Sequence, residues 1–208
     1  MGSRETHLKI GLVAALALID AIWIIAGGFS FELSSLTSAI CATVAMAAIG
    51  YVYARLRPNA RLAAMGTETA FLISFSAAAA LFSYLMASLD RPLIDGALMR
   101  ADAWMGFDWM AYVGFVNVHP WLGTLSSAVY QSCLFQVALA FILLPSIGRT
   151  DRVRELTWLV MISGIVCITI SGLLPALGAM AYLHPSPAFL AQNHPVVDLA
   201  YKAPLYAL

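Results

Sequence analysis

The side chains of this sequence that could do chemistry gather between Leu89 and Gln136. The stretch is dense in aromatic and acidic residues, and it passes through His119-Pro120-Trp121 into an apolar segment whose first turns are unusually polar. Imidazole and carboxyl groups can transfer protons, and guanidinium groups bind phosphate or carboxylate. The residues that we expect to line a binding cleft here are Arg91, Asp95, Arg100, Asp102, His119, Ser127, Tyr130 and Gln131.

The composition indicates where such a cleft would lie. Of the 208 residues 62% are hydrophobic and only 11% are charged, and the mean hydropathy is +0.85. A soluble domain carries about 25% charged residues, so the chain is an integral membrane protein. Its net charge is zero, which argues against a nucleic-acid partner and leaves membrane lipids as the expected one.

No residue spacing in the chain is typical of a metal or redox site. The cysteines Cys41, Cys133 and Cys167 all fall in apolar runs, without paired or metal-like spacing. We interpret them as small buried residues with no redox role. The sequence predicts no metal and no cofactor.

Five apolar segments are each long enough to cross a bilayer, which takes about 20 residues. The sequence therefore predicts an all-α fold, a polytopic transmembrane helical bundle forming one domain over residues 1–208. The predicted spans lie near residues 9–29, 34–54, 67–88, 121–147 and 154–183. Eight of the eleven basic residues fall on the side of the N-terminus, which the positive-inside rule makes cytoplasmic. The C-terminus is then outside.

The segment over residues 90–109 is too polar to span, and we expect an amphipathic helix in the outer interface. Asp90 is the predicted N-cap and Pro92 fits the first turn. Trp104 and Trp109 would lie at the level of the lipid headgroups. The helix could be a scaffold or could contact a substrate.

The predicted fourth span carries Ser127 and Gln131, and then Ser132 and Gln136, each pair four residues apart and so on one helix face. Amides and hydroxyls at this depth need partners. They either pack against other helices or face a water-filled cleft, and the pattern alone does not separate these alternatives.

Two carboxylates fall within predicted spans. Asp20 lies well inside the first, where an ionised carboxylate costs at least ~2.5 kcal/mol on insertion scales. We expect it to be protonated or to contact another helix or another subunit. Glu68 lies near the cytoplasmic start of the third span, and we expect it to reach the interface and to be structural.

The outer tail, predicted over residues 184–208, holds two histidines that each precede a proline. Asp198 follows His194 by four residues. A lone histidine and aspartate fall short of a metal or catalytic set.

Three motifs resemble the type-2 phosphatidic acid phosphatase superfamily, and most closely the branch similar to inositol-phosphorylceramide synthase. They are DRPLIDGALMRADAWMGFDW from Asp90, HPWL with SSAVYQSCLFQ from His119, and GLLPALGA over residues 172–179. The resemblance implies a helical bundle in a bacterial inner membrane with its active site at the outer face. There, a histidine attacks a lipid phosphoester and a second histidine, held by an aspartate, acts as acid or base.

The defining motifs of that family are a Pro-Ser-x-His segment and a later His-x-x-x-Asp segment, and we expect neither of them in this chain. The resemblance therefore predicts a chain without the catalytic histidine motifs and without catalytic residues of its own. We expect an accessory or structural subunit of a larger membrane assembly, held to other transmembrane subunits. The alternative is a truncated form of an active lipid phosphatase or phosphotransferase.

Overall fold

The computed structural model describes residues 2–29 and 34–191, and its regular elements there are all helical. The elements are α1 (Gly2–Gly27), α2 (Ser34–Tyr51), the π-helical turn η1 (Val52–Leu56), α3 (Ala60–Ala87), α4 (Asp95–Trp104), α5 (Trp109–Val118), α6 (Pro120–Ser146), α7 (Thr150–Leu173), α8 (Ala179–Leu183) and α9 (Pro187–Ala191). Five of these helices, α1, α2 extended by η1, α3, α6 and α7, are long and apolar enough to cross a membrane. The predicted all-α polytopic bundle is confirmed.

The chain forms two compact units. Unit 1 comprises Met1–Met86 and Val137–Ile170, and unit 2 comprises Ala87–Gln136 and Ser171–Leu208. The divisions fall inside α6 and α7, so both helices contribute residues to each unit.

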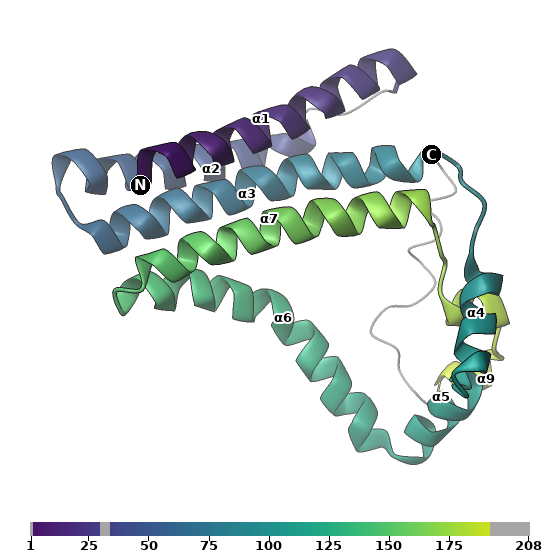
Figure 1. The fold of residues 1–208 in the computed structure, drawn as a ribbon. Coiled ribbons are helices and arrows are strands. Elements are labelled where there is room, and N and C mark those ends of the chain that lie inside the picture. The colour runs from purple at the N-terminus through teal and green to yellow at the C-terminus, as the bar shows by residue number, and fades with distance from the viewer. Residues whose placement is uncertain (1, 30–33, 192–208) are drawn as a thin grey trace. The chain divides into compact units, whose positions relative to one another are not determined.

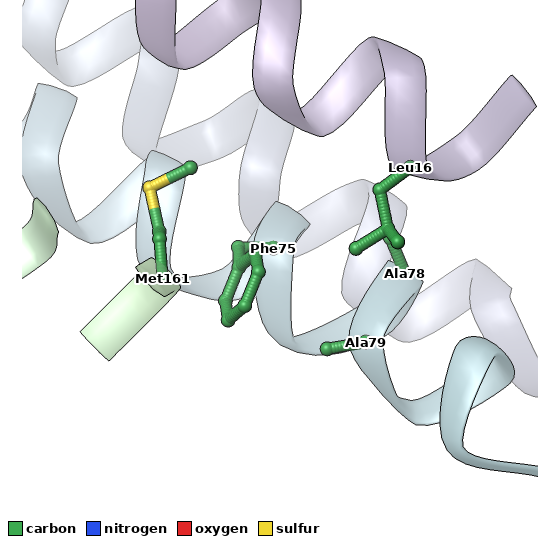
Figure 2. Close-up of a cluster of buried hydrophobic side chains, with 5 residues drawn as sticks. All are labelled: Leu16, Phe75, Ala78, Ala79 and Met161. Carbon is green, nitrogen blue, oxygen red and sulfur yellow. The ribbon is translucent and has the colours of Figure 1, made fainter. Parts of the chain in front are cut away.

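The core of unit 1 lies where α1 and α7 pack on α3, and the three helices run alongside one another in Figure 1. Figure 2 shows its buried side chains, which are Leu16, Phe75, Ala78, Ala79 and Met161. The alanines keep the face of α3 flat, so Leu16 of α1 can reach it, while the Phe75 ring extends toward α7. A second cluster of Ala64, Phe141 and Val153 joins α3 to the ends of α6 and α7 that belong to unit 1.

Glycine lets α2 and α3 approach at the backbone. A Cβ built on Gly66 would lie 2.6 Å from the backbone N of Gly50 and 2.9 Å from the carbonyl oxygen of Met46. Small residues permit such close packing between membrane helices, where lipid supplies no hydrophobic drive to associate. Only glycine fits at position 66 without moving one helix.

The long helices present large apolar side chains outward. Leu134 of α6 is 84% exposed, and Leu18 of α1 is 61% exposed. A water-soluble monomer does not expose apolar surface on this scale, whereas a lipid-facing helix does. The exposed faces therefore support the multi-pass membrane assignment.

The predicted interfacial helix over residues 90–109 is wrong in its bounds, since α4 begins only at Asp95 and α5 follows as a separate helix. Asp90 does not cap a helix and has a left-handed φ of 46°. Pro92 disfavours helical backbone at the residue before it, which delays the start. Gly106, with φ of 75°, then turns the chain between α4 and α5.

The last span is also shorter than predicted. The sequence indicated a helix to residue 183, but α7 ends at Leu173 and the chain turns before α8. Pro175 cannot donate the hydrogen bond that would continue α7, and Gly178 has a φ of 86°.

The three cysteines are free and exposed, so our interpretation of them as buried is wrong. They lie on outward faces of their helices rather than between them.

Candidate functional site

The carboxylate of Asp95 clamps the start of α4 onto the turn that follows α7. Its Oδ2 accepts a hydrogen bond from the backbone N–H of Leu177 at 3.0 Å, and its Oδ1 accepts one from Gly178 at 2.8 Å. The residue is only 4% exposed. Hydrogen bonds to an ionised carboxylate are roughly twice as strong as neutral ones. Both oxygens of this predicted cleft residue are thus used inside unit 2.

The turn over residues 175–178 is shaped to meet this carboxylate. The backbone N–H of Ile94 donates to the carbonyl oxygen of Pro175 at 2.9 Å, so the two segments are also joined through the main chain. Gly178, with φ 86° and ψ 160°, adopts a conformation that is essentially restricted to glycine. Its carbonyl oxygen then accepts hydrogen bonds from Ala181 and Tyr182 in α8. Hydrogen bonds therefore link the Asp95 carboxylate, the turn over residues 175–178 and α8.

An arginine and a tyrosine lie over the first turn of α4. A Cβ built on Gly96 would lie 3.2 Å from the hydroxyl of Tyr182 and 3.8 Å from Nη1 of Arg100. Arg100 is exposed and Tyr182 is 49% exposed. A guanidinium group and a phenol hydroxyl are both hydrogen-bond donors that an anion could accept from. Of the predicted cleft residues, Arg100 is the one that the structure pairs with a second donor.

Within residues 2–29 and 34–191, no hydrogen bond or ion pair joins the other predicted residues of this region to Arg100 or Tyr182. Arg91 is exposed and precedes α4, and Asp102 is half-buried within it. His119 ends α5, where its Nδ1 lies 2.9 Å from the carbonyl oxygen of Phe115 and its ring lies 4.4 Å from the Phe115 ring. One nitrogen of this imidazole is therefore held by its own helix.

The polar residues of α6 are satisfied within their own helix or face outward. Gln136 donates through Nε2 to Oγ of Ser132 at 2.6 Å, and that hydroxyl donates to the carbonyl oxygen of Val129. Tyr130 and Gln131 are exposed, and Ser127 is half-buried. The four-residue spacing thus produces an intrahelical pair.

Unit 1 buries three charged side chains near or within its spans. Lys9 and Glu68 form an ion pair at 2.6 Å, with side chains only 2% and 6% exposed. Glu68 therefore does not reach the interface, because Lys9 of α1 neutralises it inside the unit. Asp20 is 1% exposed, and neither of its oxygens has a hydrogen-bond partner among residues 2–29 and 34–191. No three potential metal ligands form a cluster within the described ranges, residues 2–29 and 34–191.

Comparison with known families decides the assignment. Residues 96–204, just over half of the chain, match the model of the PAP2 superfamily. The chain belongs to the PAP2 superfamily. It is a lipid-phosphatase-like membrane protein, as the resemblance implied. No curated protein and no solved structure matches the chain.

The family match divides this PAP2 superfamily member into a matched part and a part that precedes it. It begins at Gly96, so it takes in α4 to α9, whereas α1, α2 and α3 precede it. The turn at Gly178 and the donors Arg100 and Tyr182 all fall within the matched residues, and Asp95 directly precedes them. The family likeness therefore covers most of unit 2 and the last two spans, α6 and α7.

Our statement on missing motifs needs one correction from the sequence. His194 and Asp198 have the His-x-x-x-Asp spacing of the PAP2 superfamily, although no Pro-Ser-x-His segment precedes them. Both residues lie outside the described residues. The sequence thus lacks a Pro-Ser-x-His segment but holds one His-x-x-x-Asp spacing.

Two features of the site were missed at the sequence level. Lys9 was counted only as a cytoplasmic charge, although it begins the first predicted span and Glu68 lies near the start of the third, so opposite charges at the same end of two spans could have indicated a pair. The Asp95 clamp had only a weak signal, the Pro-x-x-Gly pattern at Pro175 and Gly178, which is typical of a turn.

Proposed function

We propose that unit 2 forms the lipid-headgroup platform of a PAP2-type membrane assembly, with Arg91, Arg100 and Tyr182 as its donors, and that the chain acts there as an accessory or structural part. The observation that carries the proposal is that the Asp95 carboxylate is buried and fully hydrogen-bonded. A carboxylate that served as acid or base would have to reach a substrate proton. Here the carboxylate is buried and both oxygens accept backbone hydrogen bonds, so its role is to hold the platform together.

The donors that remain accessible favour binding over hydrolysis. Arg100 and Tyr182 supply a guanidinium group and a hydroxyl beside Gly96, and Arg91 lies exposed just before α4. Arginine binds phosphate oxygens through a planar set of N–H donors and cannot act as a base, because it stays protonated. The sequence holds no Pro-Ser-x-His segment to accompany them. The platform therefore holds a lipid phosphate without attacking it.

The test uses the 208-residue protein reconstituted into phosphatidylcholine vesicles containing phosphatidic acid or undecaprenyl pyrophosphate. We expect phosphate release no faster than from protein-free vesicles. We also expect copurified phosphatidic acid to fall in the Arg100→Gln variant and to remain in the Arg149→Gln variant, whose arginine lies in unit 1. Phosphate release that a substitution in this chain abolishes would overturn the proposal.

The second candidate function is a lipid phosphatase or phosphotransferase to which these residues contribute catalytic groups. The spacing of His194 and Asp198 favours it, because the resemblance implies a catalytic histidine that an aspartate holds. The His194→Ala variant separates the two functions. If the chain is an accessory platform, the substitution should not change its binding of phosphatidic acid. If the chain is an enzyme, the substitution should abolish phosphate release.

The accessory role also predicts a partner. Gentle solubilisation followed by native mass spectrometry should find the chain in a complex with another transmembrane subunit. A protein recovered only as a monomer would contradict the accessory role while leaving lipid binding intact. We propose the bacterial inner membrane as its location, with the N-terminus cytoplasmic.

A further inference from the structure

The carboxylate of Asp20 lacks a partner inside a packed unit. It is 1% exposed on α1, and none of the described residues donates a hydrogen bond to Oδ1 or Oδ2. Lys9 is the next charged residue toward the N-terminus on α1, and at 11 residues it lies about 16 Å away along the helix axis. Its ammonium group is already paired with Glu68. A buried carboxylate normally has a cation or several donors beside it.

Asp20 lies in the wall of a partly open cavity that is lined by α1, α2 and α3 within unit 1. The cavity has a volume of about 400 Å³. Its wall is otherwise apolar apart from Thr43 and Ser74, and the Ser74 hydroxyl donates to the carbonyl oxygen of Phe71 on its own helix. Many small side chains keep the space open, among them Ala17, Ala39 and Ala77.

The volume and the charge together limit what could enter. Pockets of 300–1,000 Å³ suit small organic ligands, and this cavity falls within that range. Phosphate and other anions are excluded, because the cavity's acidic side chain repels them. An ammonium group carries three donors and a compensating charge, so it can serve both carboxylate oxygens. An alcohol has one donor and no charge.

We propose that this cavity binds a lipophilic amine, a molecule with an apolar body and a basic nitrogen that pairs with Asp20. The apolar body fills the space between α2 and α3, and the ammonium group neutralises the carboxylate on α1. The residues that form the site precede the match to the PAP2 superfamily, so the site is separate from the proposed headgroup platform. It gives the first three helices a ligand of their own.

The test measures thermal unfolding of the full chain in detergent with n-octylamine, and with n-octanol as a matched neutral probe. At ten times its Kd the amine should raise the Tm by about 3–6 °C, since binding to the folded state alone stabilises it. Octanol should raise the Tm by less than half as much. Asp20→Asn, which keeps the shape of the side chain, should remove the difference between the two probes.

Two further variants keep the test decisive if Asp20→Asn fails to fold. Ala39→Leu fills the cavity and leaves the carboxylate, so it should abolish the effect of octylamine. Ala15→Leu, on an exposed position of α1 outside the cavity, should retain it. Equal shifts from octylamine and octanol in the wild type would overturn the proposal, as would an undiminished amine shift in Ala39→Leu. Dimerisation that depends on Asp20 without an amine effect would overturn it in favour of a partner helix.

Discussion

Single substitutions in the buried ion pair between Lys9 and Glu68 should lower the stability much more than substitution of both residues together. The ammonium Nζ lies 2.6 Å from Oε2 of Glu68 and 3.3 Å from the carbonyl oxygen of Arg154. It also lies 5.7 Å from the ring centroids of Phe71 and Trp158, within the range of a cation–π contact. Lys9 therefore joins α1 to α3 and α7 through contacts on every side of its charge.

The expected loss of stability follows from the burial of both charges. Removing one partner of a buried pair leaves an uncompensated charge and costs about 3–5 kcal/mol, whereas replacing both by apolar residues of similar volume is often neutral or stabilising. We expect Lys9→Met and Glu68→Met each to lower the Tm by about 6–20 °C, at ~2–4 °C per kcal/mol for a chain of this size. The double variant should unfold within a few degrees of the wild type.

The assay is circular dichroism during thermal unfolding in a mild detergent, analysed as a double-mutant cycle. The exposed pair of Arg152 and Glu155, whose side chains are 56% and 58% exposed, serves as the control. Glu155→Met should change the unfolding free energy by no more than about 1 kcal/mol. If the effects of Lys9→Met and Glu68→Met simply add in the double variant, the two groups do not interact and the reasoning is refuted.

Three further predictions concern the clamp, the glycine contact and the topology. Asp95→Ala removes the two hydrogen bonds from the partly buried backbone N–H groups of Leu177 and Gly178, so it should cost about 1–3 kcal/mol in unfolding free energy, and Asp95→Asn, which keeps one acceptor, should cost less; equal losses would contradict the hydrogen-bond geometry. Gly66→Ala should cost about 1–3 kcal/mol because its Cβ meets the backbone of α2, while Gly11→Ala, which meets nothing within 4 Å, should be neutral or slightly stabilising. In intact cells, a cysteine replacing Trp104 in a chain without its native cysteines should react with a membrane-impermeant maleimide, and a cysteine replacing Arg57 should not; the reverse pattern would contradict the orientation that we propose.

The helices that cross the membrane could be predicted from the sequence because length and hydropathy are properties of single segments. Their ends were less certain, since a proline or glycine decides locally where a helix stops, as Pro175 and Gly178 do after α7. The helix expected over residues 90–109 failed for the same reason, because Pro92 and Gly106 outweigh its amphipathic pattern.

The contacts that form the site could not be read from the sequence. Asp95 meets Leu177 and Gly178 across 82 and 83 residues, and Lys9 meets Glu68 across 59. Nothing in the spacing of residues specifies a pairing between segments so far apart. The burial of Asp20 was expected from its place in a span, but its cavity depends on how α1, α2 and α3 pack.

The Asp95 clamp also has a consequence for the timing of biosynthesis. At ~5–20 residues per second, the ribosome needs about 4–16 s after adding Asp95 before it adds the two residues that bind its carboxylate. During that interval α4 has emerged without the partner that fixes its first turn. The segment between α3 and α6 therefore reaches its final conformation only after α7 has been made, which makes it a late-folding part of the chain.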